Sequence, residues 1–179
     1  MIRSILLATT LAFAALPALA VAQNAEPTAG PTANAIPKQD RDFIEDAAMG
    51  SLVEIQTAQV ALRQAMTDDV KKLAQRLLDD HTKMNEKVRQ VAQQKGITLP
   101  TDLDQKHRDH LTDLTKIPGV RFDREYVTDM VKDHEGDIKA FEKEVKDGKD
   151  PEIKELAVEA LPTLREHLNL AKQAQDRLK

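Results

Sequence analysis

The chain has 179 residues, no cysteine, few aromatic residues, and 30 acidic against 26 basic residues, for a formal charge of -4. The absence of cysteine excludes disulfides, thiolate chemistry and cysteine-based zinc sites. A mildly acidic chain with interspersed charges and few aromatic rings is not expected to bind nucleic acid or an anionic membrane surface.

Residues at the N-terminus have the three-part pattern of a secretory signal peptide. One basic residue, Arg3, precedes an apolar run from Ile5 to about Leu16, and small residues follow at Ala20 and Ala22. The run is too short to anchor the chain in a membrane. We expect cleavage after Ala22 or Ala20 and a periplasmic or secreted mature protein with no membrane-spanning segment.

The rest of the chain divides into a leader and one domain. Residues 23–38 are rich in Pro, Ala, Thr and Gly without apolar periodicity, which predicts a flexible leader after the signal peptide of residues 1–22. Residues 39–179 are numerous enough for one domain with a substantial core and too few for two domains.

Apolar residues recur at helical spacing in four long segments, of which the first covers residues 40–66. The second helix begins after Thr67 or Asp68, because either side chain can cap it. It ends at about Lys95, since Gly96 is a typical helix terminator.

A connection over residues 96–121 follows, with a short helix expected at about residues 103–116. The third long helix is predicted over residues 122–147. The fourth begins with Asp150 as its cap and Pro151 at its first helical position, a combination that favours the start of a helix.

Connection lengths predict the topology. The first and second helices, and likewise the third and fourth, are joined by only a few residues, so each pair must form an antiparallel hairpin. The connection over residues 96–121 can span a bundle roughly 40 Å tall, given about 1.5 Å per helical residue. The sequence therefore predicts an all-α, ferritin-like four-helix bundle made of two antiparallel hairpins joined by a long crossover.

One polar residue interrupts the apolar face of each long helix near its middle: Glu54, His81, His134 and His167. The midpoints of equal antiparallel helices meet at one level. Burying a polar group without a partner costs roughly 1 to 3 kcal/mol. We therefore expect these four side chains to contact one another, or something that lies between them.

Two interpretations of this set are open. Imidazole and carboxylate groups are good ligands for one divalent transition metal such as zinc, iron or manganese, which gives a mononuclear site. Free histidines have a pKa near 6.5, so such binding is expected to weaken below about pH 6. Alternatively, the residues form a structural hydrogen-bond network in which Glu54 accepts from the histidines. No nucleophile with a paired base is visible, so the sequence names no reaction, substrate or protein partner.

An acidic residue directly precedes each of these histidines: Asp80, Asp133 and Glu166. Adjacent helical residues differ by about 100° in direction, so the acids cannot point inward together with the rings. Each acid either reaches sideways to orient a histidine on the next helix or is an ordinary surface charge.

The other two histidines of the chain, His107 and His110, lie three residues apart in the expected short helix. They are either exposed side chains or a pair able to hold a surface metal ion.

Six short motifs resemble a known family. They are A-x-x-G-x-x-x-E at residues 47–54, DDH at 79–81, G-I-x-L-P at 96–100, FDREY at 122–126, DHEGDI at 133–138 and LPTLREH at 161–167. In this order they look like the exported bacterial family called domain of unknown function 4142, over about residues 39–178. The resemblance implies an exported ferritin-like bundle, often labelled an outer-membrane protein, without an established activity.

The wider ferritin-like group implies a metal in the bundle core. Its di-iron members carry Glu-x-x-His on two helices, whereas here the residues three positions before the histidines are Leu78, Val131 and Leu164. The bridging carboxylates are absent, so no di-iron centre is expected.

Overall fold

Five helices make up residues 35–179, the part of the chain that the computed structural model describes. No strand occurs within this range, which confirms the predicted all-α class. The predicted signal peptide, and the predicted leader as far as residue 34, lie outside the described residues. The helices are α1 (Lys38–Gln64), α2 (Asp68–Lys95), α3 (Gln105–Thr115), α4 (Val120–Asp147) and α5 (Pro151–Arg177).

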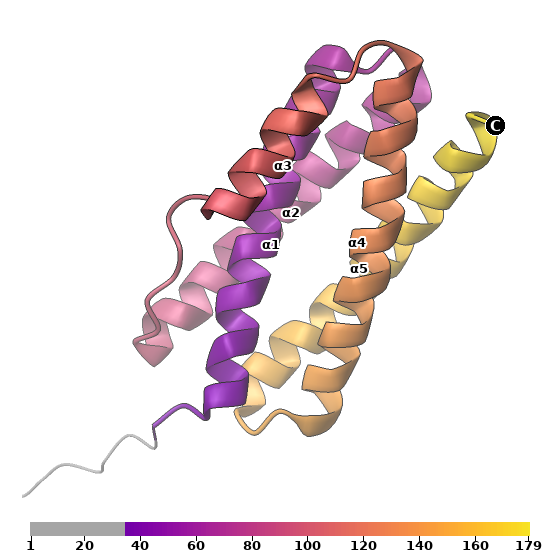
Figure 1. The fold of residues 1–179 in the computed structure, drawn as a ribbon. Helices are drawn as coiled ribbons and strands as arrows, with labels where there is room; N and C mark the ends of the chain where they lie inside the picture. Colours follow the sequence, from indigo (N-terminus) through magenta and orange to yellow (C-terminus); the bar gives the residue numbers. More distant parts are fainter. Residues whose placement is uncertain (1–34) are drawn as a thin grey trace, which may run out of the picture. The chain divides into compact units, whose positions relative to one another are not determined.

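The four long helices form two antiparallel hairpins, α1 with α2 and α4 with α5 (Figure 1). Ion pairs between the hairpins join Asp69, early in α2, to Arg177, late in α5, and Lys95 at the end of α2 to Asp150 before α5, both at 2.9 Å. Helix α2 is therefore antiparallel to α5 and parallel to α4. The short helix α3 lies in the connection that returns the chain between them (Figure 1).

The predicted helix caps are present. Gly96 follows α2 with a φ of 66°, in the left-handed region that glycine adopts without strain. The Thr67 side chain accepts a hydrogen bond from the backbone N–H of Val70 at the start of α2. Asp150 accepts from two backbone N–H groups in the first turn of α5, at 3.0 and 3.2 Å, and Pro151 follows at the first helical position.

Helices α1 and α4 each begin two residues earlier than predicted, and α1 also ends two residues earlier. Pro37 precedes α1 and its carbonyl accepts the first helical hydrogen bond. Gly119, with a φ of 61°, lets the chain turn directly into α4. Helix α1 stops at Ala65, whose backbone is extended, because the next two residues bond to a side chain of the other hairpin.

That side chain is one of two buried aspartates that join the hairpins, here called the aspartate clasps, Asp40 and Asp123. Asp123, in the first turn of α4, accepts backbone N–H groups of the α1–α2 turn at 2.9 Å and the Thr67 hydroxyl at 2.8 Å. Asp40, in the first turn of α1, accepts backbone N–H groups of the α4–α5 turn at 3.0 and 2.5 Å. Each hairpin therefore holds the turn of the other.

A polar layer divides the apolar core into two clusters. One cluster packs toward the α1–α2 turn and contains, among others, Ala58, Leu77, Met130 and Ala171. The other packs toward the α4–α5 turn and contains, among others, Ala48, Val88, Phe141 and Leu164. Between them, at mid-helix, lie the buried side chains of Glu54, His81, His134 and His167. Among the helices of residues 35–179, none combines the length and the apolar character that a membrane crossing requires.

Candidate metal centre

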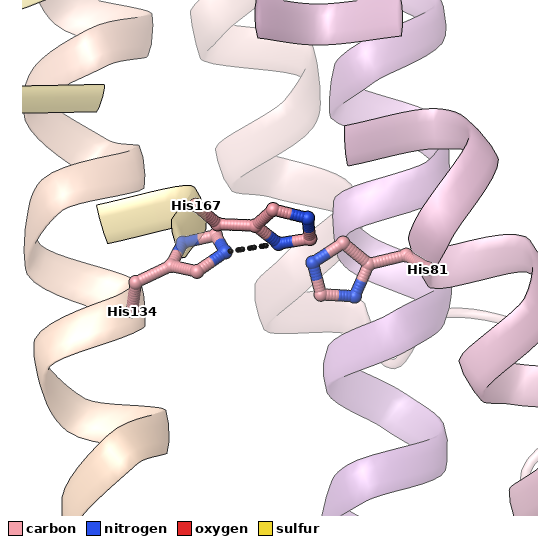
Figure 2. A group of neighbouring side chains, drawn as sticks. All are labelled: His81, His134 and His167. Atoms are coloured by element: carbon pink, nitrogen blue, oxygen red, sulfur yellow. Dashed lines mark hydrogen bonds between the residues drawn. The ribbon is translucent and has the colours of Figure 1, made fainter. Parts of the chain in front are cut away.

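Three buried imidazoles from three helices meet in the polar layer. His81 comes from α2, His134 from α4 and His167 from α5, and their exposed fractions are 2%, 0% and 0%. The ring centroids lie 5.2 to 5.6 Å apart. One nitrogen from each ring lies within 4.8 Å of the others, and the rings turn toward one another (Figure 2). We call these three residues the histidine cluster.

Two of the rings belong to a continuous chain of polar contacts. Nδ1 of His134 lies 2.9 Å from the carbonyl oxygen of Met130, one turn earlier on α4. Nε2 of His134 lies 3.2 Å from Nδ1 of His167 (Figure 2). Nε2 of His167 lies 3.0 Å from Oδ2 of Asp80 on α2. The chain therefore begins at a carbonyl and ends at a carboxylate.

This chain of contacts is one proton short when both imidazoles are neutral. A carbonyl oxygen and an ionised carboxylate only accept hydrogen bonds, and each neutral imidazole carries a single N–H. Three contacts need three protons, whereas the rings of His134 and His167 supply two. When the outer two contacts are made, two nitrogen lone pairs face each other at 3.2 Å. An extra proton or a metal cation would satisfy both nitrogens.

The 3.2 Å separation also suits a metal. Two nitrogens bound at about 2.0 to 2.1 Å in a tetrahedral site lie about 3.3 Å apart. His134 and His167 therefore already have the spacing of two ligands of one ion. The separations to His81 are at most 4.8 Å, so an inward movement of its side chain would complete a three-imidazole set.

His81 is the member of the cluster without a polar partner. Neither Nδ1 nor Nε2 of this ring has a hydrogen bond within the described part of the chain, although both atoms are buried. An unsatisfied buried polar group costs about 1 to 3 kcal/mol. The ring therefore has two free nitrogens that face a buried site from which water is largely excluded.

All three imidazoles are held in the neutral form that metals bind. Burial lowers the pKa of His134 to about 4, with His167 adding to the shift. Burial also sets the pKa of His81 well below its ordinary value, helped by the other two rings. Burial lowers the pKa of His167 as well, against the opposing effect of its hydrogen bond to Asp80.

Asp80 orients His167 across the interface between α2 and α5. Burial alone would raise the pKa of Asp80, but hydrogen bonds from Arg76 and His167 outweigh it, so the pKa lies below its usual value. An ionised carboxylate fixes the proton of His167 on Nε2 and leaves Nδ1 free toward the cluster. Of the three acids that precede the histidines, Asp80 contacts a histidine on the next helix. Glu166 also crosses the interface between α5 and α2, but its partner is Arg76, at 3.1 Å.

Glu54 lies in the polar layer but on the other side of His134. Its Oε1 is 3.6 Å from Nδ1 of His134, the nitrogen that already contacts the Met130 carbonyl. Glu54 is 3% exposed, and neither oxygen has a hydrogen-bond partner among residues 35–179. Burial raises its pKa well above the ordinary value, and Asp137, Asp133 and Asp129 add to the shift. The structure therefore places Glu54 next to the histidine cluster, not among its converging nitrogens.

Sequence reasoning found the three histidines and left open whether Asp80 orients one of them. The Met130 carbonyl was not anticipated, although position i−4 of a helix is the natural acceptor for an inward-facing ring. Whether Asp80 contacts a histidine on the next helix was left open, because that contact depends on how far α2 is rotated against α5. The residues three positions before the histidines are apolar, and one of them, Leu164, is buried in the core.

Comparisons with known proteins agree with the fold. A sequence model of the family described as "Domain of unknown function (DUF4142)" matches residues 25–174. A solved DUF305 fragment from Deinococcus radiodurans is 15% identical with a TM-score of 0.71, covering 79% of this chain and 98% of that one. No match was found among curated proteins.

Two structures of CopM, one in the Cu(I)-bound form and one in the Cu(II)-bound form, are also similar. They are 20% and 21% identical, with TM-scores of 0.65 and 0.66. The alignments cover 77% and 78% of this chain and 96% and 97% of theirs. At these identities, the likeness shows a shared helical fold.

Proposed function

Since the chain belongs to the family described as a domain of unknown function (DUF4142), whose description names no activity, we propose a function from the site itself. The protein is a helical bundle that binds one transition-metal ion between His81, His134 and His167. The ligand nitrogens are Nε2 of His134, Nδ1 of His167 and one nitrogen of His81.

This proposal rests on the contacts from the Met130 carbonyl through His134 and His167 to Asp80, which need one proton more than two neutral imidazoles supply. Near neutral pH, the lowered pKa values of His134 and His167 disfavour an extra proton between the two rings. A metal cation supplies the positive charge without protonating either ring. It also gives a partner to one of the two free nitrogens of His81.

Copper is the metal that we propose. Imidazole ligands suit zinc, copper, iron and nickel, and Cu²⁺ binds most tightly of the divalent first-row ions to a given nitrogen site. The solved CopM structures of similar fold are copper-bound, which supports the same choice. Zinc, iron and manganese, the ions considered from the sequence, are the comparison ions for the experiment.

We further propose that the protein works outside the cytoplasm, because the first 22 residues have the pattern of a signal peptide. The expected mature N-terminus is Val21 or Gln23. Intact-mass measurement of the native protein from a periplasmic extract tests this, and a retained leader in the membrane fraction would overturn it.

Metal analysis of the untagged protein tests the metal proposal. We expect one copper per chain after reconstitution, lost in His81→Ala and retained in the matched variant His107→Ala, whose histidine lies on α3 outside the cluster. Glu54→Gln is expected to keep the stoichiometry, because Glu54 faces the opposite nitrogen of His134. Equal copper content in the parent and His81→Ala would overturn the proposed ligand set.

A second candidate function is a structural bundle in which the same residues only fix the helix register. The contacts from His134 to His167 and from His167 to Asp80 favour it, since they already join three helices. In that case His81→Ala would change stability, while copper, zinc, iron(II) and manganese would leave the melting temperature of the parent unchanged.

A further inference from the structure

A cavity of about 480 Å³ opens between α1, α3 and α4, outside the histidine cluster. Most of its charged lining is acidic. Two lysines, Lys106 and Lys132, are the basic members of the lining. The carboxylates are Glu54, Asp129, Asp133 and Asp137, and two imidazoles, His107 and His110, join them.

Three of these carboxylates form a row on α4. Asp129, Asp133 and Asp137 are four residues apart, so each lies about 6 Å along the helix from the next and on the same face. Like charges at this spacing destabilise a helix. At one end of the row, Nε2 of His110 lies 3.1 Å from Asp129. The other two aspartates have no ion pair with a basic residue in the described chain.

Glu54 extends the row into the interior. It lines the same cavity, it is 3% exposed, and its carboxylate oxygens lack hydrogen-bond partners in residues 35–179. Its unpartnered oxygens are free to accept hydrogen bonds from the water of a hydrated cation in the cavity. Glu54 also lies beside His134, so the inner wall of the cavity is next to the histidine cluster.

A second, smaller cavity of about 80 Å³ reaches the cluster itself. His81 lines it, together with Met84 and Ser51. Gly50 and Asp137 line both this cavity and the larger acidic one. The two cavities therefore adjoin at these residues, and a Cβ added to Gly50 would meet no atom within 4 Å.

We propose that the acidic cavity collects a hydrated divalent cation from solution and passes it between Gly50 and Asp137 to His81. This inference rests on the proposed function of the histidine cluster. The carboxylates of the cavity do not converge on one point, since among described residues the histidines alone form a compact ligand group. Hydrated ions held through water bind weakly, as an ion in transit must.

The histidine cluster is buried, so a metal ion can reach it only through an opening in the bundle, and the cavity provides one. The three rings are at most 2% exposed, so an ion needs a path through the bundle wall. A concave surface with one sign of charge concentrates the opposite ion and raises its rate of association. The row on α4 runs along this path and ends at Asp137, beside the smaller cavity that reaches His81.

Loading kinetics provide the first test. Stopped-flow mixing of the protein with Cu(II) is expected to show loading slowed by about ten-fold in Asp137→Asn, through loss of charge attraction. Gly50→Leu, which fills the passage, should slow loading at least as much. Both variants should keep the equilibrium stoichiometry of the parent. The matched controls are Glu155→Gln, an exposed acid on α5, and Gln59→Leu, an exposed position on α1. Loading at the parent rate in both test variants would overturn the proposed path.

A second test separates this inference from the proposed function. Manganese(II) prefers oxygen ligands, so it should occupy the acidic cavity even when the histidine cluster is disabled. In His81→Ala, or in His81→Gln if the alanine variant is unfolded by circular dichroism, Mn²⁺ should broaden the amide NMR signals near Asp133 and Asp137. The broadening should disappear after Asp133→Asn together with Asp137→Asn. Absence of localised broadening would overturn cation binding in the cavity, whereas failure of the parent to bind copper would overturn the proposed function alone.

Discussion

The pKa of His134 lies near 4 because the ring is buried and faces His167. A free imidazole, with a pKa near 6.5, is largely protonated at pH 5 and then no longer binds a metal. Burial also lowers the pKa values of His81 and His167 from that of a free imidazole. Proton competition at the cluster is therefore expected at a lower pH than for free histidines.

Copper affinity is accordingly expected to change less than about three-fold between pH 7.5 and pH 5.5, and to fall below about pH 4.5. A free histidine would lose about ten-fold per ligand over the first of these intervals. Isothermal titration across this range measures the difference, with a three-histidine peptide as control. A loss in the protein equal to that in the peptide would show that burial does not hold the rings neutral.

Asp137 has the opposite kind of shift. Burial, with the charge of Asp133 adding to it, raises the pKa of Asp137 to about 6 from an ordinary 3.8. The folded state then binds more protons than the unfolded state between these values, so stability falls as the pH rises through this window. A charge that weakens the fold at neutral pH is consistent with a role in the path to the cluster.

Asp137→Asn should raise the free energy of unfolding by about 1 to 2 kcal/mol at pH 7.5, after allowance for the partial exposure of the side chain. The gain should shrink steadily as the pH falls from 6 toward 4, because the parent then carries a neutral Asp137 in the folded state. Urea unfolding at several pH values measures this, with Glu155→Gln on α5 as the control. A gain that does not depend on pH would contradict the assigned charge.

The helices are joined at their ends by the aspartate clasps, and each clasp satisfies backbone groups that no helix can satisfy. The first N–H groups of a helix, and those of the turn before it, have no partner within the helix. Asp123 supplies an acceptor for those of the α1–α2 turn, and Asp40 for those of the α4–α5 turn.

Asp123→Ala should lower the free energy of unfolding by on the order of 2 to 4 kcal/mol, because it leaves two backbone N–H groups and the Thr67 hydroxyl without their acceptor. Asp109→Ala on the exposed face of α3 is the control and should change the stability little. Chemical denaturation of the three proteins at pH 7 measures the effect. Equal stability of Asp123→Ala and the control would mean that water replaces the clasp at no cost.

The sequence predicted the helices well because their apolar faces and caps are local properties. The sequence also predicted that the four inward polar residues lie at one height in the bundle, since the midpoints of antiparallel helices of equal length meet. The contact of Asp80 with a histidine on the next helix was one of two possibilities that the sequence left open, because it depends on how far α2 is rotated against α5. The contacts of Asp40 and Asp123 could not be predicted, because their partners are more than fifty residues away in the chain. The position of Glu54 beside the converging histidine nitrogens also depends on how the helices pack.

The polar layer crosses the whole molecule and separates two apolar clusters. The histidine cluster joins α2 to α4 and α5, and therefore one hairpin to the other. A ligand that binds this cluster in the folded state alone stabilises the entire bundle by mass action. Without a metal, the chain of contacts through His134 and His167 lacks one proton and His81 has no polar partner. The polar layer therefore contributes less to stability than the two apolar clusters do.

Copper at a free concentration 100 times its Kd should therefore add about 2.7 kcal/mol to the free energy of unfolding and raise the Tm by about 5 to 10 °C. Scanning calorimetry of the parent with and without copper measures this. His81→Ala is expected to show no such rise, while His107→Ala should behave as the parent does. An unchanged parent Tm would favour the structural network.

The two aspartate clasps are reciprocal. Each hairpin gives an aspartate from the start of its first helix to the turn of the other, so the relation is unchanged when the two hairpins are exchanged. Such reciprocity is the mark of a two-fold contact between identical subunits. The bundle thus has the form of a hairpin dimer whose halves have been fused by a linker. Chains of residues 35–99 and 104–179, produced apart and mixed, would hold both clasps complete and should combine into a non-covalent heterodimer.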